Sequence, residues 1–543
     1  MKSENAPITL YVISSFIIGS LTYLIHRLLK IGSRPSNLPP GPPTSPIWGN
    51  LKQLSNVIPQ KQYREWSKEY GPVFTIMSGS EPYVVVNEAK AAHHIFVKNG
   101  LRTAARPDPR LNLILRGGYF PSLMSGADWL KARKMWQSIL TVGASKQYLP
   151  YQDLEAKKLL FDVLEDANHW RNHIERFSNS IAMTMTNGHR VPASDNPLIS
   201  EVIEDLQDWV QLTLKAWWLP SYPMLFKLPN FLIPVLNKAR KVGKYHKSLV
   251  MRLYNLTKQR VAEGMVLPSF NQSIQEKVRQ NPGILSEAEG AEIGMALLTA
   301  ATDTTAASLV NWFAAMANYP EAQRKAREEI DRVVGPNRLP REEDGENLPY
   351  VRQVVQETER WLTVAPLGLF HATTAPVEYN EWEIPAGTGL ILNTYAIHKD
   401  ADVYPSPQDF LPERWEGKLE TAAEDSLGAK SEHFAFGAGR RICPGQYLAE
   451  RSLFLVMSHV LWAFEISKAR DADGNEVPVD TNDLRPGAVA TINPFRVTVK
   501  PRSEKKVALV RRIWEEEREA LLDEDEQWRE SPEGVARLMS KVK

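Results

Sequence analysis

The single cysteine of the chain, Cys443, lies in a segment whose residue types favour a reactive sulfur. Residues 434–445 read Phe-Ala-Phe-Gly-Ala-Gly-Arg-Arg-Ile-Cys-Pro-Gly, and a largely apolar stretch with helical character follows from 446 to 464. Because proline is favoured in the first turn of a helix, Cys443 is predicted at or beside the N-cap. There the helix dipole and free N–H groups favour a thiolate, which can bind a metal. The simpler alternative is a buried cysteine in a glycine-rich turn.

A polar cluster interrupts a second apolar stretch of helical character. Residues 300–305 read Ala-Ala-Thr-Asp-Thr-Thr. Hydroxyl groups inside a helix compete for backbone carbonyls and can bend the helix locally. The cluster alone is therefore equally consistent with threonines that only bond back to their own helix and with a functional site.

Two further pairs of residues are spaced to share a helix face. Trp129 and Arg133 are four residues apart in a helix predicted within 128–137, where an indole N–H and a guanidinium together suit a carboxylate. Glu357 and Arg360 are three residues apart on a helix predicted from Pro349 to before Pro366. Such pairs are common on solvated helices, so each pattern is weak by itself.

The cysteine segment carries a more specific pattern. Phe436, Gly439, Arg441, Cys443 and Gly445 together resemble the haem-binding signature of the cytochrome P450 family. In that family the cysteine is the proximal thiolate of the haem iron, a ligand that favours O–O cleavage. The resemblance implies that Cys443 binds the iron of haem b, that Phe436 packs near the sulfur, and that Arg441 pairs with a haem propionate.

The same resemblance gives roles to the weaker motifs. Asp303 and Thr304 resemble the acid and alcohol that relay protons in the oxygen-binding groove of the family, although Ala301 stands where the family commonly has glycine. Trp129 and Arg133 correspond to residues that contact haem propionates. The likeness therefore implies two catalytic residues and a propionate-binding pair.

Two other positions follow from the likeness. His371 falls where the family often has a further propionate donor, whereas a lone histidine is more often structural. Arg414, within residues 412–415, corresponds to an arginine that joins Glu357 and Arg360 in a buried triad. Buried charges must satisfy one another, so this triad is expected to stabilise the proximal side of the fold and to do no chemistry.

The elements that must position these residues are mostly helical. Helical periodicity dominates beyond residue 60, and strands are predicted at 73–77, 83–86, 389–393 and 496–499. Ser286 and Glu289 form a capping box before a helix that continues to Asn318, and Pro320 opens the next helix. The resemblance covers residues 38–500 and implies a mainly α cytochrome P450 fold with a small β subdomain.

The N-terminus predicts a membrane anchor. Residues 8–25 are apolar and uncharged, long enough for a helix to cross the ~30 Å hydrocarbon layer. Basic residues follow this stretch, so the positive-inside rule places the rest of the chain in the cytoplasm. A cleaved signal peptide is the alternative, but no small-residue cleavage site follows. With the resemblance, this predicts a single-pass transmembrane helix in the endoplasmic reticulum.

Four segments follow from these patterns. We expect a membrane anchor at 1–30, a Pro-rich hinge and linker at 31–59, and a haem-thiolate monooxygenase domain at 60–502. The proline-rich stretch favours stiff polyproline geometry or serves as a simple linker. Residues 503–543 mix acidic and basic side chains and predict a charged, solvated helical tail.

Composition narrows the classes of partner. Lys and Arg number 65 against 64 Asp and Glu, which argues against nucleic acid as a partner. The apolar fraction of 43% excludes wholesale disorder. A single thiol can form neither an intramolecular disulfide nor a multi-thiolate zinc site.

The resemblance implies a monooxygenase that inserts one oxygen atom of O2 into a lipophilic small molecule, with NADPH electrons delivered by a separate membrane-bound NADPH-cytochrome P450 reductase. Lys131, Lys134 and Arg440 are candidate docking residues for that reductase. A lipophilic pocket is expected around the residues that correspond to substrate contacts of the family, namely Leu113, Leu115, Phe120, Leu298, Val364, Ala365, Leu369 and Val489.

Within the family, the sequence is most similar to filamentous-fungal members of secondary or xenobiotic metabolism, including the O-methylsterigmatocystin oxidoreductase type. Likeness at this level does not transfer a substrate. Two alternatives remain. One is a haem-thiolate isomerase or dehydratase that needs no reductase, and the other is a non-catalytic membrane-anchored haem protein.

Overall fold

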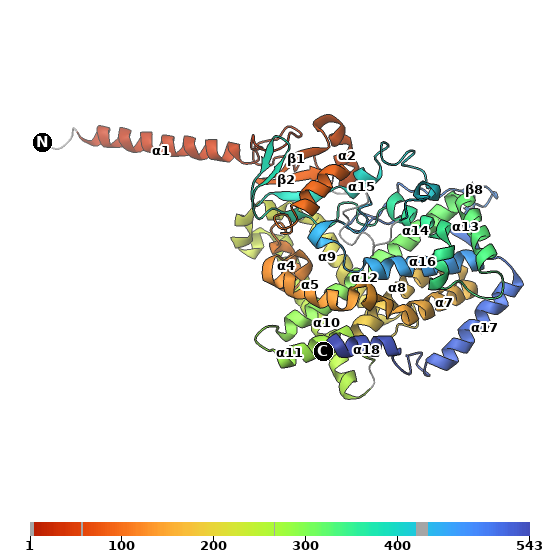
Figure 1. Cartoon of the computed structure of the whole chain (residues 1–543). Helices are drawn as coiled ribbons and strands as arrows, with labels where there is room; N and C mark the ends of the chain where they lie inside the picture. The colour runs from red at the N-terminus through yellow and green to blue at the C-terminus, as the bar shows by residue number, and fades with distance from the viewer. Residues whose placement is uncertain (1–4, 56–57, 265–266, 420–432, 543) are drawn as a thin grey trace.

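The computed structural model describes residues 5–55, 58–264, 267–419 and 433–542, and helices make up most of these ranges (Figure 1). The α-helices are α1 (Asn5–Lys30), α2 (Pro59–Tyr70), α3 (Ala89–Ala92), α4 (Arg110–Leu115), α5 (Gly126–Leu140), α6 (Val142–Lys146), α7 (Leu149–Glu165), α8 (Trp170–Asn187), α9 (Pro197–Lys215), α10 (Pro234–Ala262), α11 (Phe270–Gln280), α12 (Glu287–Asn318), α13 (Pro320–Val333), α14 (Pro349–Trp361), α15 (Thr394–His398), α16 (Gln446–Ala463), α17 (Glu504–Leu521) and α18 (Glu533–Val542). Short turns used below are η1 (His93–Lys98), η2 (Pro121–Leu123), η8 (Pro412–Trp415) and η9 (Gly439–Arg441).

The strands form three small sheets. Their bounds are β1 (Val73–Ser78), β2 (Glu81–Val86), β3 (His371–Ala372), β4 (Val377–Tyr379), β5 (Trp382–Ile384), β6 (Gly389–Leu392), β7 (Phe464–Arg470), β8 (Glu476–Val477) and β9 (Val497–Pro501). The largest sheet has the order β1-β2-β6-β3, in which β2 and β6 are parallel and the other pairs antiparallel. The four strands predicted from the sequence are confirmed as β1, β2, β6 and β9.

Helix α12 is the centre of the helical part. Its predicted capping box is present, because Ser286 Oγ accepts from the Glu289 amide while the Glu289 carboxylate accepts from the Ser286 amide. The helix packs against α8, α10, α11, α14 and α16. Near its C-terminal end, Phe313 stacks on Trp170 of α8, with ring centres 4.4 Å apart. The mainly helical fold with a small β part, expected from the sequence, is therefore confirmed.

The N-terminal helix α1 projects away from the rest of the chain (Figure 1). Its large apolar side chains face outward, with Tyr11 75% and Phe16 76% exposed. Among the residues described, only α12 has both the length and the apolar composition to cross a membrane, and it is a core helix. The apolar stretch of α1, Tyr11–Tyr23, is shorter.

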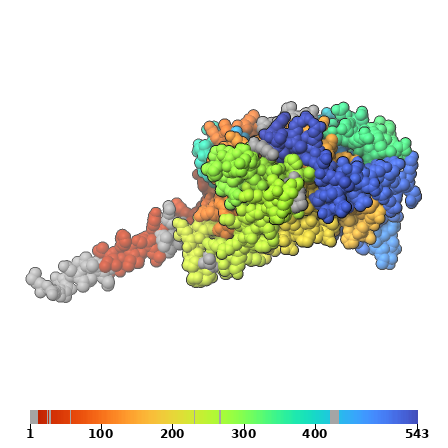
Figure 2. Space-filling view, turned by 90° about the horizontal axis from the view of Figure 1, so that it is seen from below, coloured from red at the N-terminus to blue at the C-terminus, as the bar shows by residue number. Residues whose placement is uncertain are grey.

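The C-terminal segment differs from its predicted form. It is helical, but it is not solvated on all sides, because Trp514 of α17 is 3% exposed and Trp528 is 7% exposed. Helix α17 packs along α7, and α18 contacts α5 and α11. Figure 2 shows this dark blue segment lying on the surface of the molecule beside the green helices. Charge patterning alone missed the apolar residues that recur along one face of each helix.

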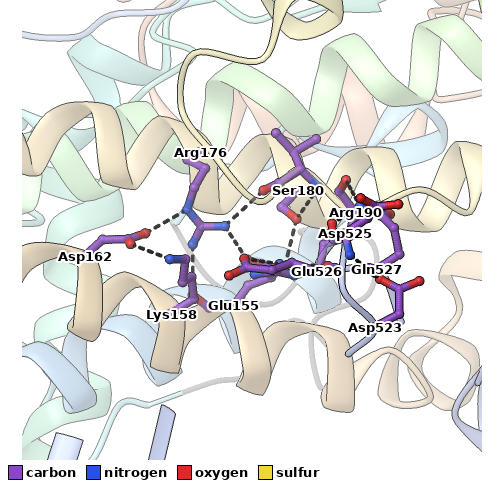
Figure 3. A network of polar contacts seen from close by, with 11 residues as sticks. Glu155, Lys158, Asp162, Arg176, Ser180, Arg190, Asp523, Asp525, Glu526 and Gln527 are labelled. Carbon is purple, nitrogen blue, oxygen red and sulfur yellow. Dashed lines mark hydrogen bonds and ion pairs between the residues drawn. The ribbon is translucent and has the colours of Figure 1, made fainter. Parts of the chain in front are cut away.

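A buried ionic network holds the C-terminal segment in place (Figure 3). Glu155 of α7 bonds both Arg176 of α8 and Arg190, whose Nε lies 2.7 Å from Glu155 Oε1. Arg190 in turn reaches Glu526 at 3.1 Å, and Gln527 Nε2 donates to the Arg190 carbonyl at 3.2 Å. Burial alone would raise the pKa of Glu155, but the two arginines outweigh it and lower the pKa. The segment is therefore tied to the core by charge as well as by packing.

Candidate haem-binding site

The sulfur of Cys443 lies just before the first turn of α16. Gly445 is the N-cap residue, and the Cys443 amide donates to the Phe436 carbonyl at 2.9 Å. Burial raises the pKa of the Cys443 thiol, while the amides of Gly445 and Gln446 and the positive charge of Arg133 act in the opposite direction. The position predicted at or beside the N-cap is confirmed, and the sulfur has the N–H donors that a thiolate requires.

The loop before the cysteine depends on one glycine. Gly439 has a φ of 65°, and a Cβ at this position would lie 2.0 Å from the Phe96 carbonyl oxygen of η1. A side chain is excluded both by the left-handed conformation and by this close approach. The loop therefore keeps its course against η1 because residue 439 is glycine.

A cationic pocket lies next to this loop. The Arg441 guanidinium stacks 3.8 Å above the Trp129 ring of α5. Its Nε donates to the Ala104 carbonyl at 2.8 Å, and its Nη2 donates to the Met124 carbonyl at 2.6 Å. Arg133, one turn after Trp129 on α5, donates from Nη1 to the Ile442 carbonyl at 2.7 Å. The structure thus brings the predicted propionate-binding residues Trp129, Arg133 and Arg441 together.

A third guanidinium, which was not predicted from the sequence, lies in this pocket. Arg106 donates from Nη1 to the carbonyls of Leu369, at 2.5 Å, and Phe370, at 2.8 Å. Burial lowers the pKa of Arg106 to about 9. Burial also lowers the pKa of Arg441 to about 8, with further lowering by the positive charges of Arg106 and Arg133. Arg106 lies in a loop without periodicity, so only the fold shows that it lies in this pocket.

His371 borders the same pocket from strand β3. Its Nδ1 lies 2.9 Å from the Thr103 carbonyl, and its ring meets the edge of Phe96 at 5.0 Å. Burial, together with Arg106 and Arg441, lowers the pKa of His371 to about 3, although its bond to Thr103 acts the other way. A neutral His371 that donates from Nδ1 can donate from Nε2 only after it gains a proton. A neighbouring carboxylate would favour that second proton.

These residues fit the acidic edge of a haem. The hydrogen bonds described for the three arginines end on backbone carbonyls, which leave the positive charges unneutralised. Within the described residues, the buried Nε of Arg133 has no hydrogen-bond partner. Partly buried cations are stabilised by counter-charges. Two propionate groups would supply that charge beside Cys443, whose sulfur would bind the iron.

The middle of α12 carries an open stripe. Ala300 and Thr304 are exposed, and Ala301, Asp303 and Thr305 are half-buried, although the neighbouring turns of this helix lie in the core. A stripe of exposed residues inside a core helix must line an opening in the protein. The residues predicted to relay protons are therefore accessible from that opening, while α12 itself packs against α16, the helix that follows Cys443.

Hydroxyl groups along α12 bond back to the helix, as one of the two interpretations of the polar cluster expected. Thr304 Oγ1 donates to the Ala300 carbonyl at 2.9 Å, and Thr302 Oγ1 donates to the Leu298 carbonyl at the same distance. Ser178 of α8 donates to the Ala301 carbonyl at 2.8 Å. The helix is continuous through this region. The carbonyls of the open stripe are thus partly occupied by hydroxyl donors.

The surroundings of Asp303 favour the protonated form of its carboxyl. Burial raises the pKa of Asp303, while the positive charges of Arg485 and Arg171 act in the opposite direction. A general acid works best when its pKa lies near the working pH. The environment of Asp303 is therefore suited to proton transfer.

The triad predicted from the family pattern is present. Arg360 forms a bidentate pair with Glu357 at 2.8 and 2.7 Å, and Arg414 reaches the same carboxylate at 3.2 Å. Glu357 has no exposed surface. Arg360 also donates to the carbonyls of Pro407 and Asp409, so the triad joins α14 to the irregular segment that follows α15. Its role here is structural, as the sequence predicts.

The expected pocket residues do not all line an opening. Leu115 and Leu298 are at most 1% exposed and belong to packed apolar clusters. Leu369 is 39% exposed. A separate hollow of about 1090 Å³ lies near the triad, with Tyr319, Tyr404 and Arg414 in its wall. Neither Cys443 nor Asp303 lines this hollow. The candidate haem-binding site is therefore a different part of the molecule.

Comparisons with known proteins agree with this site. The family model described as Cytochrome P450 matches residues 39–498. The cytochrome P450 monooxygenase alnH of Emericella nidulans is 50% identical over 539 residues, which cover 99% of this chain and 98% of that protein. The cytochrome P450 monooxygenase virE of Hypocrea virens is 37% identical over 96% of this chain and 95% of that protein. The cytochrome P450 monooxygenase fogE of Aspergillus ruber is 36% identical over 96% of this chain and 97% of that protein. The match over most of the chain shows that it belongs to the cytochrome P450 family of haem-thiolate monooxygenases.

Proposed function

We propose that this monooxygenase inserts one oxygen atom of O2 into a lipophilic small molecule, while the other atom leaves as water. NADPH supplies the two electrons through a separate flavoprotein reductase. The observation that carries this proposal is the sulfur of Cys443 at the start of α16 beside a pocket of unneutralised arginines. That arrangement fits a haem better than it fits any other use of a lone thiol.

Different residues would bind the iron and the propionates of the haem. Cys443 would bind the iron, and Arg133, Arg441 and Trp129 would hold the propionates, with His371 as a further donor. We add Arg106 to this set because its guanidinium shares the pocket. When bound, haem supplies the activation of O2 that no side chain of the protein can perform.

Asp303 and Thr304 are proposed to deliver protons to the reacting oxygen. Burial raises the pKa of the Asp303 carboxyl, which favours its proton-bearing form. The Thr304 hydroxyl, which now donates to the Ala300 carbonyl, can turn toward the opening because Thr304 is exposed. A rotating hydroxyl both accepts and donates, which is what a relay between solvent and oxygen requires.

The substrate class is proposed from the relatives and from apolar surface. The compared relatives are fungal monooxygenases, which supports a role in fungal secondary or xenobiotic metabolism. Apolar residues from α4 and from the turn after α14, including Leu113 and Val364, are half-buried. A pocket of this composition favours a lipophilic compound.

Membrane attachment through α1 supports the electron-transfer part of the proposal. The outward apolar side chains of α1 suit a lipid environment, and the basic residues after it favour the cytoplasmic side of the endoplasmic reticulum. Lys134 and Arg440 are exposed and remain candidates for reductase docking. Lys131 is a weaker candidate, because its Nζ pairs with Glu289 at 3.2 Å.

The proposed segments are a membrane anchor at 1–30, a hinge and linker at 31–59 and a monooxygenase domain from residue 60. We propose a domain that extends beyond residue 502, because α17 and α18 pack on its helices.

Purified protein reconstituted with a fungal cytochrome P450 reductase tests the proposed reaction. We expect NADPH and O2 consumption to depend on a lipophilic compound, and 18O2 to label the product with one atom. An isomerase or dehydratase would give product without NADPH, and a non-catalytic haem protein would give none.

Charge reversal at Lys134 and Arg440 should slow reduction by the reductase and leave reduction by dithionite unchanged.

A further inference from the structure

Four buried charged residues lie together outside the site described above. Arg116 follows α4, Asp205 lies on α9, His246 lies on α10 and Glu292 lies on α12. Each is at most 5% exposed. We call these four residues the roof cluster. Because they come from four separate elements, their contacts fix the relative positions of those elements.

His246 is the centre of the roof cluster. Its Nδ1 lies 2.8 Å from Asp205 Oδ2, and its Nε2 lies 2.9 Å from Glu292 Oε2. Arg116 Nη1 donates to the same Asp205 oxygen at 2.7 Å. Arg116 Nη1 also lies 2.9 Å from His246 Nδ1, so this ring nitrogen faces a cation as well as a carboxylate. The two carboxylates outweigh the cation, which favours a protonated His246. Two cations then balance two carboxylates, as buried charges require.

Arg116 connects the roof cluster to residues 117–125. Its guanidinium lies 5.2 Å from the ring centre of Phe120 and 4.8 Å from that of Trp209 on α9. The two rings meet edge to face at 5.6 Å. Contacts between a cation and an aromatic ring are stronger when they are withdrawn from water. The charge of Arg116 therefore holds Phe120 against α9.

The other end of residues 117–125 is held by the cationic pocket. Arg441 donates to the Met124 carbonyl at 2.6 Å, and Arg106 Nε donates to the Ser122 carbonyl at 3.2 Å. Between the two ends, η2 packs against α12, the helix with the open stripe. The segment therefore runs from the roof cluster to the proposed propionate site.

Two glycines form the turn that joins Arg116 to this segment. Gly117 and Gly118 follow Arg116 directly and have φ angles of 66° and 107°. Residues with side chains rarely adopt this conformation, so the turn depends on glycine. Because the turn adjoins Arg116, loss of the Arg116 contacts would release the segment at that end.

We infer that the roof cluster is a set of positioning residues that holds residues 117–125 closed against α9 and α12 and so controls how a substrate enters and lies in the cavity. The inference rests on the proposed monooxygenase function. None of the four residues needs to touch the substrate. They act through the segment and through Phe120, which is one of the expected substrate contacts.

The cluster is expected to respond to pH. The charged groups that face His246 are Arg116 from the segment before η2, Asp205 from α9 and Glu292 from α12. Burial lowers the pKa of His246, and the positive charge of Arg116 lowers it slightly further. The carboxylates of Glu292 and Asp205 outweigh both effects, so the pKa of His246 is raised. The closed arrangement is therefore most stable below about pH 6.5, the ordinary histidine pKa. The closed arrangement weakens as the pH rises through the raised pKa of His246. His246 then loses its proton, and one buried carboxylate is left without a balancing positive charge.

The test uses the haem-loaded full-length protein and 4-phenylimidazole, an aromatic ligand that binds ferric haem iron inside the cavity. Stopped-flow absorbance gives the association rate of 4-phenylimidazole at each pH. The rate constant is calculated from the concentration of the neutral form of this ligand, because the ligand itself binds a proton. We expect the wild-type rate to rise several-fold as the pH increases through the pKa of His246. The Glu292→Gln variant should show the same rise at lower pH, because the charge that raises that pKa is removed.

Variants of Arg116 separate positioning from simple stability. Arg116→Gln should raise the association rate by about tenfold at every pH, the size expected for one lost buried contact. Arg116→Lys keeps the charge and should restore part of the wild-type rate. Arg190→Gln removes a buried arginine of the C-terminal network and is the matched control. It should lower the melting temperature and leave the rate and its pH profile unchanged.

The outcomes also distinguish this inference from the proposed function. A wild-type rate that does not change with pH would contradict the inference without any variant. A Glu292→Gln profile equal to that of the wild type would contradict it as well. Either result, obtained on protein with the carbon-monoxide spectrum of a haem-thiolate, leaves the proposed function intact. Absence of that spectrum in the wild-type protein would instead contradict the proposed function.

Discussion

At the scale of single residues, the candidate site is marked by the positive charges of Arg441 and Arg106, for which the described side chains provide no counter-charge. Burial lowers the pKa of Arg441 and of Arg106, and the hydrogen bonds described for both end on backbone carbonyls. A folded protein tolerates such a group when a ligand supplies the opposite charge. The pocket therefore suits an anionic partner, and with the adjacent Cys443 it supports the proposed haem.

Arg106 offers a direct test of this charge argument. Arg106→Gln should release haem about tenfold faster, because a charge-assisted hydrogen bond contributes ~1.5–3 kcal/mol. Transfer of haem to an apoprotein acceptor measures the rate. Arg102→Gln, which removes an exposed side chain bonded to the Pro376 carbonyl, is the control and should retain the wild-type rate. Equal rates in the two variants would exclude Arg106 from propionate binding.

Thr304 offers a test of the proton relay. Thr304→Ala should keep the haem spectrum but divert NADPH electrons to hydrogen peroxide, because the accessible hydroxyl is lost. The ratio of peroxide to product measures this loss. Thr302→Ala is the matched control, since Thr302 is buried and bonded to the Leu298 carbonyl. Equal coupling in Thr304→Ala and wild type would mean that the relay uses another group.

At the scale of elements, local patterns predicted much of the scaffold. The capping box of Ser286 and Glu289 and the strand-like stretches at 73–77 and 83–86 are local signals, and the capping box and strands β1 and β2 are present in the structure. Arg106 and the roof cluster were missed, because their partners are 16 to 264 positions away along the chain. No pattern in a short window reports such contacts. The sequence therefore indicates elements better than the charges that the fold brings together.

The triad gives a prediction for the contact between α14 and η8. Glu357→Gln removes the charge that faces both Arg360 and Arg414 and leaves two buried guanidinium groups unpaired. Breaking a buried ion pair in this way costs ~3–5 kcal/mol. We expect a lower melting temperature and less haem-loaded protein, with an unchanged spectrum in the fraction that folds. Wild-type stability would show that the backbone carbonyls around Arg360 are sufficient.

At the scale of the whole molecule, the chain extends beyond the part that the family model matches. That match ends at residue 498, yet α17 and α18 return to the helical core. Phe161 of α7 and Trp514 of α17 lie with ring centres 5.9 Å apart, and Lys158 Nζ lies 4.9 Å from the Trp514 ring. The many charges of this segment suggested full solvation, whereas its few aromatic residues determine where it packs.

The C-terminal segment should therefore contribute to stability. Trp514→Ala removes a buried aromatic side chain and is expected to cost ~3–5 kcal/mol. Thermal unfolding of the haem-loaded protein measures the loss. Trp48→Ala is the control, because Trp48 is 42% exposed and should change the melting temperature little. Similar melting temperatures for the two variants would mean that the segment is not part of the folded domain.

The central claim is that the Cys443 sulfur binds haem iron. The most direct measurement is the absorption spectrum of the reduced, carbon-monoxide-saturated protein, compared between wild type and Cys443→Ser. We predict the red-shifted Soret band of a thiolate-bound haem in the wild type and its loss in the variant. A folded, haem-containing wild-type protein without that band, or a variant that keeps it, would contradict the account.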